Sequence, residues 1–223
     1  MQNFQDVQRA ATALRTAIEA AQGPSGLPLG ARRLDANASA DADAPIGIVL
    51  GTGLSQLADK LQDKVVVPYT DLPGFPASSV EGHAGAFVWG RFPGACGEDD
   101  CVGRYALIQQ GRCHLYEGRS PAEVCMGVRV MAALGAKKLI ITNAAGGLNP
   151  QFDAGGIMCM TDIINNTGHS PLTGFNHEEW GPRFPDMCAP LDPELRALAL
   201  ETASKMNLRL ERGVYIGVHG PEM

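Results

Sequence analysis

Apolar residues recur along the chain with two different periods, and the alternation of those periods indicates the fold class. From Phe4 to Ile18 they return every three to four positions, which predicts an amphipathic helix over residues 4–22. Farther along, short apolar runs such as Ile46–Leu50 end in glycine or polar residues, as buried strands do. Because strand and helix patterns alternate, the sequence predicts an α/β fold, with helices on the faces of a sheet, in a single domain over residues 1–223.

The same patterns place the other elements. We expect buried strand 139–142, the paired runs 87–89 and 105–108, and further strands at 65–67, 156–165 and 213–218. Helices are expected at 55–61, at 120–135 and from 192 onward, the last with an apolar face formed by Leu195, Leu198, Ala199 and Met206. Two stretches rich in turn-forming residues are interpreted as a flexible surface loop, 23–45, and a long connecting loop, 166–190.

One helix start is particularly well marked. Ser120 suits the N-cap, Pro121 suits the first helical position, and Glu123 can return a hydrogen bond to the cap. Gly135 is a natural stop for this helix.

Composition narrows the classes of partner. The 223 residues are 45% hydrophobic and 19% charged, with a net charge of -6, which argues against a nucleic acid or an anionic membrane as partner. We find no apolar run of membrane-spanning length and no secretory signal, and six scattered cysteines are typical of free thiols, so we expect a cytoplasmic protein. Cys96 and Cys101 flank a short turn, where a disulfide or a metal site is the alternative to free thiols.

Candidate chemistry is concentrated in Gly111–Gly118, directly after the apolar run 105–108. Arg112, His114 and Tyr116 are spaced by two, so an extended chain would point all three to one side. Arginine can bind an anion through two parallel hydrogen bonds, and histidine can donate to it near neutral pH. Glu117 is placed to orient His114. An edge strand with a solvated polar face is the alternative.

Two more strand ends carry groups that suit an anion. Gly51-Thr52-Gly53 allows close backbone approach and adds a hydroxyl, although it matches neither a Walker loop nor a dinucleotide fingerprint. Asn143–Gly147 leaves backbone N–H groups uncovered, and His83 lies in a glycine-flanked loop. Structural turns and a solvated histidine are the alternatives. Because we find no nucleophile elbow and no convincing metal spacing, the sequence predicts anion positioning without a metal or cofactor.

Together these stretches resemble the trimeric purine nucleoside phosphorylases, the inosine–guanosine phosphorylases. The matching pieces occur in family order and cover the chain from about residue 46: Gly51–Leu54, Gly82–Gly85, Gly111–Gly118, Thr142–Pro150 and Trp180–Pro185. The resemblance implies a central mixed β-sheet flanked by helices. It also implies a pentosyltransferase of purine salvage that cleaves purine (deoxy)ribonucleosides with inorganic phosphate as co-substrate. The products would be the free base and α-(deoxy)ribose 1-phosphate.

The resemblance also implies roles for individual residues. Phosphate would be held by Thr52, His83, Arg112, His114 and the backbone N–H of Ala144. His114 and Asn143 would be catalytic, and the ribose and base would meet Tyr116, Trp180 and Met223. Trp180 matches an aromatic residue that the family lends to a neighbouring subunit, which implies a homotrimer. Met223 stands where the family usually has phenylalanine.

The sequence also departs from the family pattern. It stops at Met223, before the family's base-recognising glutamate, a phosphate serine, a base-binding asparagine and a ribose histidine. We therefore expect a chain truncated at the C-terminus, without the last strands and the C-terminal helix, that lacks appreciable phosphorolysis by itself. Residues 23–45 and Cys96–Cys101 are expected to be insertions.

Three other interpretations remain. A methylthioadenosine phosphorylase is the nearest competitor, although its strand end usually carries a Thr-Ala-containing sequence where this chain has Asn143–Gly147. The chain is alternatively a non-catalytic phosphate- or nucleoside-binding remnant, or a misassembled reading frame without a stable fold. The residues that distinguish 6-oxopurines from 6-aminopurines fall outside the sequence, and the resemblance favours guanine and hypoxanthine nucleosides.

Overall fold

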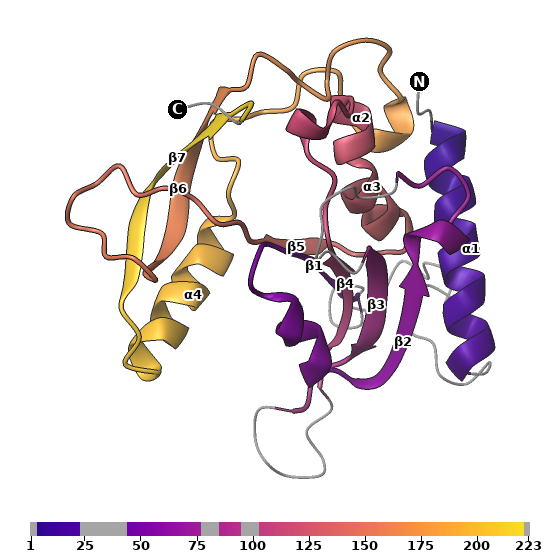
Figure 1. Cartoon of the computed structure of the whole chain (residues 1–223), viewed down its shortest axis with the longest axis horizontal. Helices are drawn as coiled ribbons and strands as arrows, with labels where there is room; N and C mark the ends of the chain where they lie inside the picture. Colours follow the sequence, from indigo (N-terminus) through magenta and orange to yellow (C-terminus); the bar gives the residue numbers. More distant parts are fainter. Residues whose placement is uncertain (1–3, 23–43, 77–84, 95–102, 221–223) are drawn as a thin grey trace. The chain divides into compact units, whose positions relative to one another are not determined.

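A computed structural model describes residues 4–22, 44–76, 85–94 and 103–220 (Figure 1). The chain divides into two compact units, residues 1–144 and 145–223, which are described separately. The predicted loop 23–45 lies almost wholly outside the described residues, as do His83, Met223 and both Cys96 and Cys101.

The first unit is built on a five-stranded sheet in the order β2-β3-β4-β1-β5. Its strands are β1 (Ile46–Leu50), β2 (Gln62–Pro68), β3 (Ala86–Arg91), β4 (Tyr105–Gln110) and β5 (Lys138–Ile141). β1 runs parallel to both β4 and β5, whereas β3 is antiparallel to β2 and β4. The sheet is therefore mixed, as predicted, and the expected pairing of 87–89 with 105–108 is confirmed.

Helices cover this sheet by burying one apolar face. α1 (Phe4–Gln22) spans the residues predicted from the helical period, and it buries Val7, Leu14 and Ile18. It packs against α3 (Met126–Ala133) and β2. The predicted start at Ser120 is confirmed, because Ser120 and Glu123 form a reciprocal capping box at the beginning of α2 (Pro121–Val124). The helix predicted over 120–135 is interrupted at Cys125, which separates α2 from α3.

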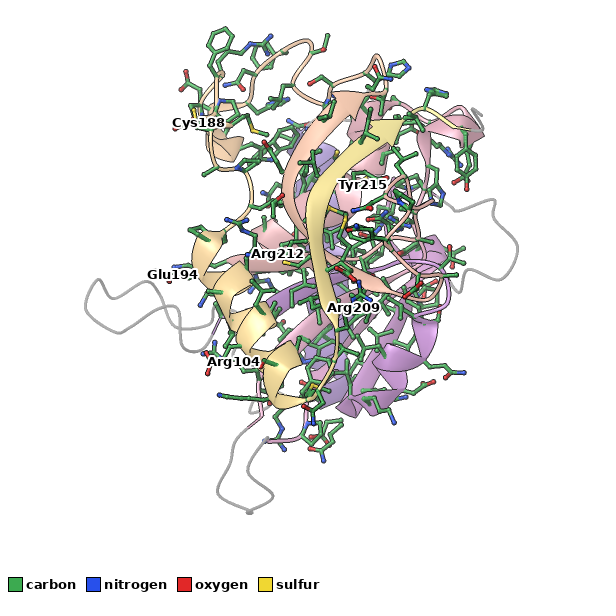
Figure 2. All side chains as sticks on the ribbon, turned by 90° about the vertical axis from the view of Figure 1, so that its left-hand side faces the viewer. Arg104, Cys188, Glu194, Arg209, Arg212 and Tyr215 are labelled. Carbon is green, nitrogen blue, oxygen red and sulfur yellow. The ribbon has the colours of Figure 1, made fainter. Side chains whose placement is uncertain are left out.

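The second unit contains a parallel pair of strands joined through a helix. β6 (Ile157–Asn166) pairs with β7 (Leu210–Val218), and α4 (Pro193–Lys205) lies between them in sequence and contacts both. Asp192 caps α4, since its carboxylate accepts from the N–H groups of Glu194 and Leu195 at 2.9 Å each. Figure 2 shows Arg212 and Tyr215 on β7 and Arg209 directly before it, where Arg209 donates to the Gln151 carbonyl at 3.4 Å.

Two local predictions are wrong. The helix expected over 55–61 is a short 3₁₀ helix, Ser55–Lys60, denoted η1. The strand expected to be buried at 139–142 is exposed, with Leu139, Ile140 and Ile141 at 37, 47 and 56%, because β5 is an edge strand of the described sheet. The helix predicted from residue 192 is confirmed as α4, on which Leu198 is 56% exposed.

Candidate anion site at three strand ends

The three strand ends singled out in the sequence lie next to one another. Register pairs Leu50 with Gln110 and Val49 with Ile141, so the parallel strands β4, β1 and β5 finish at the same edge of the sheet (Figure 1). The segments that begin at Gly51, Gly111 and Thr142 therefore leave the sheet side by side. This is the edge at which ligands bind in open α/β sheets.

The ends of β1 and β5 are in direct contact. The Thr142 hydroxyl accepts from the Gly51 N–H at 2.8 Å and donates to the Val49 carbonyl at 3.0 Å. A Cβ atom at Gly51 would lie 2.7 Å from the Asn143 Cα atom, so the two chains approach as closely as glycine allows. Sequence reasoning missed this role of Thr142; a lone hydroxyl closing an apolar strand was its only signal.

Thr52 stands on a tight turn after β1. The Leu54 N–H donates to the Gly51 carbonyl at 3.2 Å, and Gly53 has a φ of +84°, in the left-handed region that favours glycine. Thr52 is exposed at the tip of this turn. The Gln110 side chain donates to the Ser55 carbonyl at 3.1 Å, which ties the end of β4 to the start of η1.

The Gly111–Gly118 loop is extended only in its first half. His114 is extended, with φ −125° and ψ 156°, but Leu115–Glu117 form a 3₁₀ turn that closes at Gly118 in the left-handed region. The strict alternation expected for Arg112, His114 and Tyr116 is therefore wrong at Tyr116. The His114 and Tyr116 rings are nevertheless together, stacked with centroids 4.8 Å apart and planes 15° apart.

Glu117 orients His114, as its position in the sequence indicated. One carboxylate oxygen, Oε1, lies 2.8 Å from His114 Nδ1 and accepts from the His114 backbone N–H at 2.7 Å. The Glu117 side chain is 4% exposed, so its carboxylate is almost entirely shielded from water. This contact fixes the orientation of the imidazole ring, and the His114 side chain is 21% exposed.

The remaining loop residues differ in burial. Arg112 is partly buried directly after the turn at Gly111, where φ is +96°. Cys113 is buried and its thiol donates to the Pro76 carbonyl at 3.5 Å. Burial raises the pKa of the Cys113 thiol to about 11, and the nearby Glu117 carboxylate acts in the same direction. Cys113 is therefore an unreactive structural thiol. The four described cysteines, Cys113, Cys125, Cys159 and Cys188, are all free.

Of the other predicted site residues, Asn143 and Ala144 follow β5 at this edge of the sheet. Asn143 is partly buried after β5 and its side-chain amide donates to the Ala144 carbonyl at 3.1 Å; Ala144 is exposed. Trp180 belongs to the second unit, in the 3₁₀ turn Glu178–Trp180, where its ring lies 4.7 Å from that of His177. His83 and Met223 fall outside the described residues.

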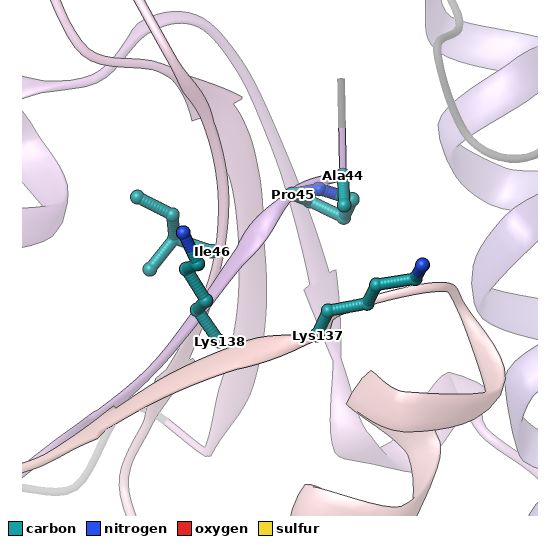
Figure 3. Close-up of a pocket in the computed structure, with 5 residues that line it drawn as sticks. All are labelled: Ala44, Pro45, Ile46, Lys137 and Lys138. Atoms are coloured by element: carbon teal, nitrogen blue, oxygen red, sulfur yellow. The ribbon is translucent and has the colours of Figure 1, made fainter. Parts of the chain in front are cut away.

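A small pocket lies at the opposite edge of the sheet. Figure 3 shows its lining: Ala44, Pro45, Ile46, Lys137 and Lys138, from the amino ends of β1 and β5. The two lysine side chains point away from each other and so do not converge on one ligand. Because the pocket lies at the amino ends of these strands, it is separate from the candidate anion site at their carboxyl ends.

Comparison with known proteins identifies the family. The profile of the phosphorylase superfamily matches residues 45–222. The chain belongs to the phosphorylase superfamily. Within it, the chain is 46% identical over 176 residues to purine nucleoside phosphorylase 1 of Geobacillus stearothermophilus, covering 79% of the chain and 61% of that relative. It is 40% identical over 181 residues to purine nucleoside phosphorylase of Mus musculus, covering 79% and 60%.

Solved structures of the superfamily agree with the fold. The chain matches purine nucleoside phosphorylase from Schistosoma mansoni in complex with acetate, with a TM-score of 0.78 and 34% identity over 99% of this chain and 72% of that one. The predicted fold class and family resemblance are thus confirmed. The chain spans about 61% of the length of the Geobacillus stearothermophilus relative.

Proposed function

We propose that this protein takes part in purine nucleoside phosphorolysis and that the described strand ends hold the phosphate. Inorganic phosphate would be bound by Thr52, Arg112, His114 and the Ala144 N–H, with His83 as a further donor. Tyr116 and Asn143 would face the ribose. The adjacency of the β4, β1 and β5 carboxyl ends is the observation that carries the proposal, because the segments that begin at Gly51, Gly111 and Thr142 leave the sheet at one edge.

The chemistry of the reaction suits these residue types. The bond between the ribose C1′ atom and the purine nitrogen breaks, the purine leaves with the electron pair and takes up a proton, and a phosphate oxygen bonds to C1′. While that bond breaks, the ribose acquires positive charge, which a bound phosphate anion stabilises. Fixing the phosphate against C1′ is worth about 7–11 kcal/mol in favourable cases. Arg112 and His114 would supply this fixation, and guanine and hypoxanthine nucleosides are the proposed substrates.

Calorimetry tests the proposal on the 223-residue chain. Inorganic phosphate titrated into the wild-type chain should bind saturably, and the Arg112→Ala variant should lose that binding. Inosine added to the phosphate-loaded chain then separates two outcomes. Release of hypoxanthine and ribose 1-phosphate supports phosphorolysis by this chain, whereas binding without products supports a phosphate-binding remnant. A wild-type chain that binds no phosphate would overturn the proposal.

We further propose that the protein assembles as a homotrimer through the loop that contains Trp180. Arg183 fixes this loop by donating to the carbonyls of Leu172 and Gly174, each at 2.8 Å. Outward from it project Phe175, Phe184 and Met187, which are 86, 88 and 62% exposed. A fixed loop that exposes two phenyl rings supports an interface between copies of the chain. The free cysteines support a reducing, cytoplasmic compartment.

A further inference from the structure

Tyr69 is hydrogen-bonded to Gly111, the first residue of the Gly111–Gly118 loop. Its hydroxyl donates to the Gly111 carbonyl at 2.6 Å, in a buried position 42 residues away in sequence. The Tyr69 side chain is 3% exposed. A buried hydrogen bond of this kind is not exchanged with water, so losing the donor leaves the Gly111 carbonyl without its partner.

The same residue also reaches the segment that carries His83. The Tyr69 backbone N–H donates to the carbonyl of Gly85, the last residue of the Gly82–Gly85 motif, at 2.8 Å. Its ring packs against Phe75 and Phe87, with centroids 4.4 and 5.5 Å away, so the hydroxyl is aimed by a fixed ring. One residue thus ties together the ends of two segments that bear predicted phosphate ligands.

The hydrogen bond sets the orientation of the peptide before Arg112. In a planar trans peptide the carbonyl and the N–H point in opposite directions. Holding the Gly111 carbonyl toward Tyr69 therefore turns the Arg112 N–H away from the buried ring. A second contact holds the loop nearby, where the Cys113 thiol donates to the Pro76 carbonyl at 3.5 Å. The segment Tyr69–Pro76 thus supports the loop at two points.

The Tyr69 hydroxyl is a donor throughout the working range of pH. Burial raises the pKa of Tyr69 far above its ordinary value, and a hydrogen bond with Gln109 opposes that shift only in part. Gln109 is itself buried, and its side chain occupies the space beside Gly127, where a Cβ atom would lie 2.2 Å from Oε1. The Tyr69 hydroxyl, which holds the Gly111 carbonyl, therefore has a buried and closely packed neighbour in Gln109.

We propose that Tyr69 is a positioning residue for phosphate binding: its hydroxyl holds the Gly111–Gly118 loop in the geometry in which Arg112 and His114 meet the anion. Tyr69 itself does not touch the phosphate. The inference rests on the proposed function, and it assigns a role to a residue outside the predicted site.

The test is the affinity for inorganic phosphate of the Tyr69→Phe variant, measured by calorimetry well below its melting temperature. Removing one buried donor should weaken phosphate binding about tenfold while the ring packing is retained. Tyr105→Phe is the matched control, because Tyr105 lies at the end of β4 opposite the Gly111–Gly118 loop. Its ring stacks on that of Trp89, with centroids 5.0 Å apart. Its phosphate affinity should equal that of the wild-type chain.

The outcomes separate this inference from the proposed function. If the wild-type chain binds no phosphate, both are overturned. If it binds phosphate and Tyr69→Phe binds equally well, the inference alone fails. A lowered melting temperature with unchanged phosphate affinity also overturns it, because that result shows a role in stability without positioning.

Discussion

At the scale of single residues, the contact between Glu117 and His114 is the sharpest feature of the candidate site. One buried carboxylate holds both the ring and the backbone of His114. We predict that Glu117→Ala weakens phosphate binding by about tenfold to a hundredfold, because hydrogen bonds to a charged group are worth about 1.5–3 kcal/mol. Calorimetric titration with inorganic phosphate measures the change.

The matched control is Glu123→Ala. Glu123 also accepts from a backbone N–H three residues earlier, that of Ser120 at 2.9 Å, but it does so at the start of α2. Its removal should lower stability and leave phosphate affinity unchanged. Equal losses of affinity in both variants would show that Glu117 has no specific role in orienting His114.

At the scale of elements, the junction of β1 with β5 determines whether the strand ends can share a ligand. A Cβ atom at Gly51 would meet the Asn143 Cα atom at 2.7 Å and the Thr142 carbonyl oxygen at 2.8 Å. Gly51→Ala should therefore destabilise the fold by about 1–3 kcal/mol, as overpacking does. It should also weaken phosphate binding, because the two ends are forced apart. Urea unfolding gives the first quantity and calorimetry the second.

Gly146→Ala provides the comparison for Gly51→Ala. A Cβ atom at Gly146 meets nothing within 4 Å. This variant should match the wild-type chain in stability to within about 0.5 kcal/mol. A Gly51→Ala variant as stable as Gly146→Ala would contradict the close approach of β1 and β5.

The start of α2 predicts a pH dependence. Hydrogen bonding from the Ser120 backbone N–H holds the pKa of Glu123 below its ordinary value. A carboxyl whose pKa is lowered by folding stabilises the protein above its unfolded pKa, and that contribution is lost as the pH falls through the folded value. Glu123→Gln should thus lower the melting temperature at pH 7 and have little effect at about pH 3.

The control for this pH dependence is Glu194→Gln. Glu194 occupies the first turn of α4, in the second unit. Melting curves of both variants across the same pH range separate a specific effect of the α2 capping box from a general effect of removing one acidic side chain. A pH-independent difference between Glu123→Gln and the wild-type chain would refute the prediction.

At the scale of the whole molecule, the exposed rings of the Trp180 loop predict self-association. We expect sedimentation equilibrium to give three times the mass of one chain for the wild-type protein. Phe184→Ser should shift it toward the monomer, since Phe184 is 88% exposed. Val66→Ser, at an exposed position on β2, should leave the mass unchanged. A monomeric wild-type chain would exclude the proposed trimer.

Local sequence patterns predicted the limits of helices and strands better than they predicted which of them are buried. The limits of α1 and the cap at Ser120 follow from neighbouring residues, so they were read correctly from the sequence. The exposure of β5 was not predicted, because an apolar run carries no information about whether its strand lies at the edge of a sheet.

The candidate site shows the same division. Glu117 and His114 are three residues apart, and their contact was predicted. The contacts of Thr142 with Gly51 and of Tyr69 with Gly111 join residues 91 and 42 positions apart, and no local pattern predicts such pairings. The roles of Thr52, Arg112, Asn143 and Ala144 stay predictions, although their segments do meet at one edge.

The most direct measurement is a phosphate titration of the isotopically labelled 223-residue chain followed by backbone amide NMR. If β4, β1 and β5 present one site, the amide signals of Thr52, Arg112, His114 and Ala144 should shift together and fit a single dissociation constant. Shifts confined to one of these segments, or different dissociation constants among them, would contradict a shared phosphate site.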